Sequence, residues 1–277
     1  EWKEYWKDDK TELYHFIGKD NIPFHTIFFP AMLMADGGYN LPYNVVGLQY
    51  LNFERKKFSK SQGHGVFCEN LPTAGLNADY WRFYLSYIIP ETGDTEFLWK
   101  DFQERINKDL IDNFGNFINR TLTFIWKNFD GSISGKTDKK FYNEVNKKIK
   151  EIINLYEKVE LRLALEDILK LSDLGNKYFQ ENEPWKTRSR DVLFNCVNLC
   201  KILSLLIQPY LPTSSEKILK LLNCDEKNWK KLEEFNIKKI NKPSILFKKL
   251  DSNEIEELKV KTSKVTEFKI KNGKSKT

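Results

Sequence analysis

The sequence of 277 residues has few cysteines and no cysteine motif. Its four cysteines are Cys68, Cys196, Cys200 and Cys224, and no two of them have the CxxC spacing of a zinc knuckle. Cys196 and Cys200 are four residues apart in an apolar run, which indicates one buried helix face. We therefore expect no metal site in this sequence. Because nothing indicates disulfides, we expect a reducing compartment, the cytoplasm.

Other common signatures are also missing. The sequence has neither a GxGxxG fingerprint nor a P-loop, which excludes both common nucleotide-binding loops. It has no run of 18 uninterrupted apolar residues, so we expect no membrane span and no membrane partner. It opens on Glu1-Trp2 in mid-pattern, without Met and without a signal peptide, and we interpret it as a fragment of a longer chain.

The composition is that of a folded protein with a basic surface. Hydrophobic residues make up 40% and aromatic residues 14%, which is enough for a packed core and excludes wholesale disorder. The net charge of +6 fits a polyanionic partner. A lysine-rich surface without any such partner explains the charge equally well.

Hydrophobic patterning predicts an α/β beginning. Residues 13–17 form a short apolar run that ends at Gly18, as a buried parallel strand would. A helix with one internal proline is predicted over 24–34, and a second strand over 44–50. Strand, helix and strand indicate part of a parallel sheet. Residues 51–97 are irregular and marked by glycines.

The remainder is predicted to be helical. Apolar residues recur at steps of three and four, which predicts helices over 99–125, 142–156, 161–178 and 192–207. The last of these is apolar all round and should be the central helix. Pro209 and Pro212 should end it, and Ser214 and Ser215 should cap a last short helix. Residues 98–224 thus read as an antiparallel bundle. After Lys259 come six lysines and one acid, Glu267, and we expect this tail to be solvated.

The sharpest motif is Lys57-Phe58-Ser59-Lys60-Ser61, which Gly63 and Gly65 follow. Two ammonium groups in a loop can meet a polyphosphate, and the glycines allow close backbone approach. A loop of lysines and serines also arises by chance.

This pentapeptide resembles the KMSKS signature of class I aminoacyl-tRNA synthetases, with Phe in the second position. Residues 11–34, 52–67 and 78–90 are similar, in the same order, to segments of methionyl-tRNA synthetases. The resemblance implies an α/β then all-α fold in four parts. Residues 1–50 would end a Rossmann-type catalytic domain and 51–97 would be the KMSKS-loop connector, like a stem-contact fold. Residues 98–224 would be the helical-bundle anticodon-binding domain, and 225–277 a lysine-rich extension.

The resemblance also implies an activity. The parent protein would activate methionine with ATP and Mg²⁺ to methionyl-adenylate, and then transfer it to the tRNA for methionine. The family's HIGH signature and its zinc-bearing insertion would lie upstream and are absent here. We therefore expect zinc only in that missing part, and no activity from these residues alone.

Site residues follow from the same resemblance. The catalytic residues would be Lys60, assisted by Lys57. The ATP contacts would come from Lys60 and from Gly18, Asp20, Ser59 and Ser61. Asp20 would contact the ribose hydroxyls, at the carboxyl end of a strand. Because it precedes a helix, it could instead be a helix N-cap.

Methionine would be bound by His25, Phe29 and Asn21. Many relatives have Trp where this chain has Phe29, and bacterial relatives often have Ile where it has Asn21. Core packing would also explain His25 and Phe29.

The anticodon would be read by Asn116, Arg120, Trp185 and Pro184. An exposed Trp next to Pro suits the stacking of an unpaired base. Ordinary exposed polar residues and a partly buried structural Trp are the alternatives.

Other functions stay open at this point. The chain could belong to a related class I synthetase for Leu, Ile, Val or Cys, although these lack the FIGKD…FH…FFPAM run found here. It could be a tRNA-binding protein without catalysis, or a structural helical protein with a chance KFSKS. The oligomeric state and any further C-terminal domain cannot be read from the residues.

Overall fold

The computed structural model describes residues 1–226 and 228–263. Its strands are β1 (Leu13–Gly18), β2 (Pro42–Leu48), β3 (Leu51–Phe53), β4 (Lys56–Lys57) and β5 (Thr95–Phe97). Its α-helices are α1 (Trp2–Trp6), α2 (Phe29–Asp36), α3 (Leu71–Ala74), α4 (Ala78–Tyr87), α5 (Trp99–Arg105), α6 (Asn116–Phe129), α7 (Lys139–Glu157), α8 (Leu161–Glu181), α9 (Pro184–Thr187), α10 (Arg190–Ile207), α11 (Pro212–Leu221) and α12 (Ser252–Thr262). Short 3₁₀ segments are η1 (Lys19–Asn21), η3 (Cys68–Asn70) and η5 (Trp229–Lys231), and π-helical segments are η2 (Phe24–Phe28) and η4 (Ile106–Gly115).

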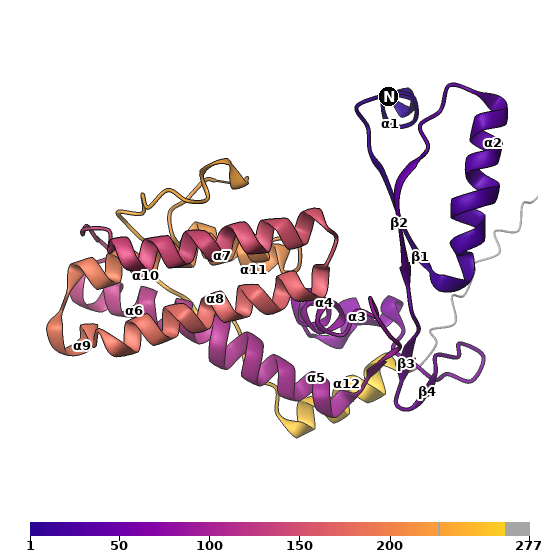
Figure 1. Ribbon diagram of the computed structural model, residues 1–277. Coiled ribbons are helices and arrows are strands. Elements are labelled where there is room, and N and C mark those ends of the chain that lie inside the picture. The colour runs from indigo at the N-terminus through magenta and orange to yellow at the C-terminus, as the bar shows by residue number, and fades with distance from the viewer. Residues whose placement is uncertain (227, 264–277) are drawn as a thin grey trace, which may run out of the picture.

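The first unit is a parallel strand pair with a crossover helix. β1 pairs with β2 in parallel, from Leu13 opposite Pro42 to Gly18 opposite Leu48. The connection runs through η1, η2 and α2, so both predicted strands and the helix between them are confirmed. Figure 1 shows that this unit projects from one end of the helical bundle.

A second, three-stranded sheet joins this unit to the bundle. β3 is the middle strand, antiparallel to β4 and parallel to β5. Phe53 of β3 and Phe97 of β5 are buried and lie in register, and α4 adds Trp81 and Tyr84 to the same aromatic core. The apolar face of α4 therefore joins the core of the bundle.

The bundle has the predicted order. A continuous helical run from α5 through η4 to α6 packs with α7, α8 and α10. Every residue from Val192 to Ile207 is buried, so the prediction of a central helix is confirmed. Gly175 on α8 allows this close packing, because a Cβ there would lie 2.6 Å from Cζ of Phe117 and 2.7 Å from Cδ2 of Leu199.

The predicted cap of the last short helix is wrong. α11 begins at Pro212, so Ser214 and Ser215 lie inside its first turn and are buried. The Ser214 N–H instead donates to Oδ2 of Asp79, at 2.6 Å, and Asp79 comes from α4. A buried carboxylate at a helix N-terminus satisfies a free N–H and favours the helix dipole. Ser214 and Ser215 were predicted as caps because they are close in sequence to the start of the helix, but Asp79, 135 positions before Ser214, caps it.

This contact gives a stability prediction. Asp79→Ala should lower the free energy of unfolding by about 1–2 kcal/mol, because the Ser214 N–H would stay buried without an acceptor. Urea unfolding followed by circular dichroism would measure it. Glu144→Ala, which removes an exposed carboxylate from α7, is the matched control and should change the value by less than about 0.5 kcal/mol. Equal effects of the two variants would contradict the capping role.

Residues 228–263 form a strap along the bundle. They add Leu232, Ile237, Phe247, Ile255 and Leu258 to the same core. The strap ends in α12, which packs against η3 and α3, behind the KFSKS loop. The lysine-rich extension is therefore no separate unit in its described part, and most of the tail after Lys259 lies outside the described residues.

Candidate functional site

The KFSKS motif lies on a β-hairpin with a strained turn. Glu54 and Arg55 connect β3 to β4, and both have positive φ, 45° and 65°. Such values suit the type I′ turn of a two-residue hairpin but are costly for residues other than Gly and Asn. Three hydrogen bonds hold the turn: Glu54 N–H donates to Phe97 O (3.0 Å), Trp99 N–H donates to Glu54 Oε1 (2.8 Å), and Arg55 N–H donates to Glu96 Oε1. The turn of the hairpin is therefore fixed.

The tip of the loop presents Lys60. Ser59 and His64 exchange two backbone hydrogen bonds of 2.9 Å, and Gly63 N–H donates to Lys60 O at 3.1 Å. The hydroxyl oxygens of Ser59 and Ser61 lie 3.3 Å apart. The Lys60 side chain is exposed, and no ion pair or hydrogen bond to its ammonium is found in the described part of the chain. Its ammonium group can therefore meet a ligand at no cost in broken contacts.

The motif's aromatic residue anchors the loop. The Phe58 ring packs on Phe53, with centroids 5.3 Å apart. It also lies against Gly65, where a Cβ would come within 2.7 Å of Phe58 Cδ1 and where φ is 152°. The His64 ring nitrogen Nε2 lies 2.8 Å from Phe53 O, which adds a second anchor. Phe58 and Gly65 thus fix the direction in which the loop leaves β4.

The loop meets the end of β1 through Tyr50. The Tyr50 hydroxyl donates to Oδ2 of Asp20 at 2.5 Å, and Lys57 Nζ lies 5.1 Å from the centroid of the Tyr50 ring. Asp20 therefore lies in η1 with its carboxylate on Tyr50, and it does not cap a helix. Gly18 leaves open space, with no atom within 4 Å of an added Cβ. Asp20, predicted to bind ATP, and Lys57, predicted to assist catalysis, thus both lie against Tyr50.

The predicted methionine contacts form part of an aromatic cluster. His25 Nδ1 lies 3.1 Å from His15 Nδ1, and the rings of His15 and Phe29 have centroids 5.8 Å apart. Trp6 meets the Phe29 ring edge to face at 6.1 Å. Burial, and the neighbouring His25, lower the pKa of His15, so that ring is neutral near pH 7. Asn21 is exposed and shares no hydrogen bond with this cluster.

The predicted anticodon residues Arg120 and Trp185 both contact the ring of Phe179. The Arg120 guanidinium lies 3.9 Å from the centroid of Phe179, and Trp185 stacks on Phe179 at 5.9 Å and 25°. Trp185 keeps 39% of its surface exposed, whereas Pro184 is buried at the start of α9. Pro184 can therefore position Trp185 but offers a ligand no surface of its own. This group lies at the end of the bundle that is far from β1 and α2 (Figure 1).

Asn116 lies one turn before Arg120 on α6 and is exposed. It lines a cavity of about 150 Å³ between the first helix of the bundle and residues 245–247 of the strap. Asn176, on α8, also lies at this side of the helix: its Nδ2 donates to Asn113 O and Oδ1, both at 3.2 Å. Asn176 therefore joins α8 to η4.

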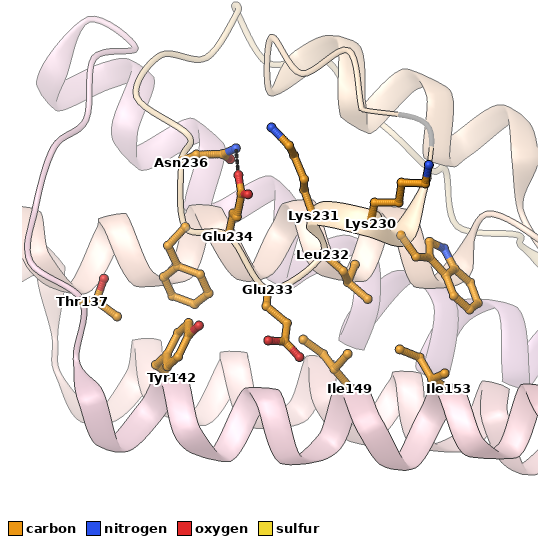
Figure 2. Close-up of a pocket in the computed structure, with 12 residues that line it drawn as sticks. Thr137, Tyr142, Ile149, Ile153, Lys230, Lys231, Leu232, Glu233, Glu234 and Asn236 are labelled. Carbon is orange, nitrogen blue, oxygen red and sulfur yellow. Dashed lines mark hydrogen bonds between the residues drawn. The ribbon is translucent and has the colours of Figure 1, made fainter.

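A larger cavity lies elsewhere. It has a volume of about 720 Å³ and lies between α7 and the strap residues 229–236. In Figure 2, Glu233 and Leu232 point toward α7, and Lys231 points away from it. None of the site residues predicted from the sequence lines this cavity. Over the described ranges, no group of three or more His, Cys, Asp or Glu side chains could hold a metal ion.

Comparison with known proteins gives the family. A family model described as "tRNA synthetases class I (M)" matches residues 1–122. A second, described as "Anticodon binding domain of methionyl tRNA ligase", matches residues 129–267. The chain belongs to the methionyl-tRNA synthetase family. The fold class that the sequence resemblance implied, α/β and then all-α, is confirmed.

Curated relatives and solved structures agree with this family. The methionine–tRNA ligase of Borreliella burgdorferi (strain ZS7) is 41% identical over 271 residues, which are 94% of this chain and 37% of that protein. The ligase of Pyrococcus abyssi (strain GE5 / Orsay) is 41% identical over 278 residues, 92% of this chain and 38% of that protein. A Mycobacterium tuberculosis methionyl-tRNA synthetase in complex with methionyl-adenylate superposes with a TM-score of 0.74 at 28% identity, over 86% of this chain and 50% of that one. The chain thus spans well under half the length of these curated relatives.

Two residues that contact the predicted site residues were not themselves predicted from the sequence. Tyr50 lies between Asp20 and Lys57, and His15 lies against His25 and Phe29. A signal for Tyr50 was its place directly before the strand that leads into the motif. For His15, the signal was a histidine within an otherwise apolar strand.

No helix within residues 1–226 and 228–263 is both long and apolar enough to cross a bilayer.

Proposed function

We propose that these residues are the carboxyl-terminal part of the catalytic core and the anticodon-binding domain of a methionine–tRNA ligase. This enzyme converts methionine and ATP to methionyl-adenylate and pyrophosphate, and then transfers the methionyl group to the tRNA for methionine. The observation that carries the proposal is the cluster at Tyr50, where the KFSKS hairpin meets the Asp20 end of β1. A polyphosphate loop and a ribose-binding carboxylate at one place are what activation of an amino acid by ATP requires. We place the reaction in the cytoplasm.

Each group has a role in this reaction. Lys60 stabilises the charge that develops on the phosphates as the methionine carboxylate attacks the α-phosphorus, and Lys57 assists. Ser59 and Ser61 shape the loop. Asp20 accepts hydrogen bonds from ribose hydroxyls, and Gly18 leaves room for the nucleotide. No covalent bond to the protein is needed, so positioning and electrostatics accelerate the step.

The aromatic cluster provides a methionine pocket. Phe29 offers an apolar wall, and aromatic rings make favourable contacts with a thioether sulfur. His25 closes one side, held by His15. Asn21 is the weakest of the proposed contacts because it is exposed and apart from the cluster.

Mg²⁺ is the expected companion of ATP in this reaction. The described residues contain no cluster of carboxylates that would hold it, so we assign no side chain of this chain to the ion.

The first unit also indicates a partner surface for the rest of the catalytic domain. Its exposed large apolar side chains are Phe16, Ile22, Phe24, Ile27, Phe28, Met32, Met34, Leu41 and Tyr43. So many exposed apolar residues on one small unit are unusual for a free surface. We propose that the remaining strands and helices of the catalytic domain cover them.

ATP–pyrophosphate exchange tests the proposal. The complete protein that carries these residues should exchange pyrophosphate with methionine and not with leucine, isoleucine, valine or cysteine. The 277 residues alone should give no exchange, because half of the ATP site would be missing. Exchange with another amino acid would move the protein to a related synthetase, and tRNA binding without any exchange would indicate a non-catalytic protein.

A further inference from the structure

Tyr50 occupies the junction between the two halves of the proposed ATP site. Its hydroxyl lies 2.5 Å from Asp20 Oδ2, and two ammonium groups lie near its ring, Lys19 Nζ at 4.2 Å and Lys57 Nζ at 5.1 Å from the centroid. Distances of this size allow cation–π attraction. One side chain thus contacts a group from the end of β1 and a group from the KFSKS hairpin.

The backbone of Tyr50 is held on both sides. Its N–H donates to Asp94 Oδ1 at 3.0 Å, and its carbonyl accepts from Thr95 N–H at 2.9 Å. The preceding residue is also fixed, because Gln49 N–H donates to Pro90 O at 2.8 Å. Tyr50 is therefore placed by the sheet around β5, independently of what its ring contacts.

The charged groups around Tyr50 keep its hydroxyl protonated, so that it can donate a hydrogen bond to Asp20. Hydrogen bonds from the Tyr50 N–H and from the Lys19 ammonium lower the pKa of Asp94, which stays ionised and holds both donors. The hydrogen bond to the Asp20 carboxylate raises the pKa of Tyr50, so the phenol keeps its proton and donates it. Asp20 has one oxygen on Tyr50, and its other oxygen, Oδ1, has no hydrogen-bond partner in the described part of the chain.

We propose that Tyr50 is a positioning residue for ATP: its hydroxyl orients the Asp20 carboxylate toward the ribose, and its ring seats Lys57 on the phosphate side. This inference deepens the proposed function and rests on it. A free carboxylate rotates about its side-chain bonds, and a hydrogen bond to one oxygen leaves the other aimed in a single direction. The distance between the ribose contact and the phosphate contact is then set by one tyrosine.

The variant Tyr50→Phe separates the hydroxyl from the ring. In the complete ligase, it should raise the KM for ATP about ten-fold, as expected for losing a hydrogen bond to a charged group, and leave kcat within about two-fold. Tyr50→Leu removes the ring as well and should also lower kcat, by about two- to five-fold, the range of a cation–π contact at an exposed site. Tyr142→Phe is the matched control on α7, since Tyr142 lies in the helical bundle and apart from the site, and it should change neither constant.

Deoxynucleotides test whether the effect passes through the ribose. Exchange is measured with ATP, 2′-deoxy-ATP and 3′-deoxy-ATP for the unchanged protein and for Tyr50→Phe. The penalty of the variant should disappear with the deoxynucleotide that lacks the hydroxyl bound by Asp20. An equal penalty with all three nucleotides would show a general loss of structure and overturn the proposal, as would an unchanged KM in Tyr50→Phe.

The same assay keeps the two proposals apart. Methionine-dependent exchange by the unchanged protein stands on its own, whatever Tyr50→Phe does. Failure of the Tyr50 variants alone overturns the positioning role, whereas no exchange by the unchanged protein overturns the proposed function and this inference with it.

Discussion

Replacing Lys60 by alanine in the complete ligase is expected to slow methionyl-adenylate formation by roughly 10²–10³, or about 3–4 kcal/mol, the usual effect of losing one preorganised transition-state contact. The structure makes this variant informative because the Lys60 side chain is exposed and has no partner to lose among the described residues. The loop itself is held by the Ser59–His64 backbone pair and by Phe58, not by the Lys60 side chain. The rate loss should therefore come from the chemistry.

Rapid-quench measurement of adenylate formation, with stability followed in parallel, gives the comparison. Affinity for methionine should barely change, because the contact forms in the transition state. Lys56→Ala is the matched control: Lys56 lies on the same hairpin, in register with Phe53, and is exposed. It should leave the rate within about two-fold if only a positioned ammonium acts and bulk charge does not. Equal rate losses in the two variants would show that the motif acts only as a basic patch. An unchanged rate in Lys60→Ala would show that Lys60 has no part in the mechanism.

The fold was predictable wherever the signal was local. Strand β1 is marked by a short apolar run and the long helices of the bundle by clear hydrophobic periods, and both signals depend only on neighbouring residues. The central helix α10 contains a feature that no local pattern predicts. Lys201 lies in its apolar run, and its ammonium is fully buried, bound to Lys231 O (3.2 Å), Glu234 O (2.5 Å) and Asn236 Oδ1 (3.1 Å). These acceptors are at least 30 residues away in the strap, so no local pattern could show that a charge would be satisfied there.

In the candidate site, too, the residues of a contiguous motif were predictable, whereas a contact between distant residues was not. Lys57 and Lys60 were predicted from a contiguous motif, and the structure places both on one hairpin. The contact between Tyr50 and Asp20 joins residues 30 positions apart and depends on how β2 runs into β3. The alternative in which Asp20 caps a helix was reasonable locally, because Asp favours that position. The Asp20 carboxylate is instead held by Tyr50, which lies between β2 and β3, and only the three-dimensional arrangement shows this contact.

Variants at the end of the bundle that carries α9 should distinguish anticodon reading from general charge attraction in tRNA binding. Trp185→Ala should weaken tRNA binding by roughly 1–3 kcal/mol through lost base stacking. Arg120→Ala should weaken the tRNA for methionine more than a tRNA with another anticodon, since base contacts specify while phosphate contacts only position. Because Arg120 and Trp185 both contact Phe179, we expect these two variants to be coupled. Asn116→Ala, one turn away on α6, should show the same preference but add independently.

Binding of the 277 residues themselves to the two tRNAs, at one fixed salt concentration, is the measurement. Lys261→Ala provides the contrast, because Lys261 is an exposed lysine on α12, near the KFSKS loop and away from α9. It should weaken both tRNAs alike and reduce the salt dependence of binding by about one unit of slope. Arg120 and the partly exposed Trp185 both contact the Phe179 ring and so lie close together, where an unpaired base can stack on them, whereas scattered lysines offer no stacking surface. If Trp185→Ala and Arg120→Ala weaken cognate and anticodon-swapped tRNA equally, this end of the bundle is only a basic surface, and the anticodon assignment is wrong.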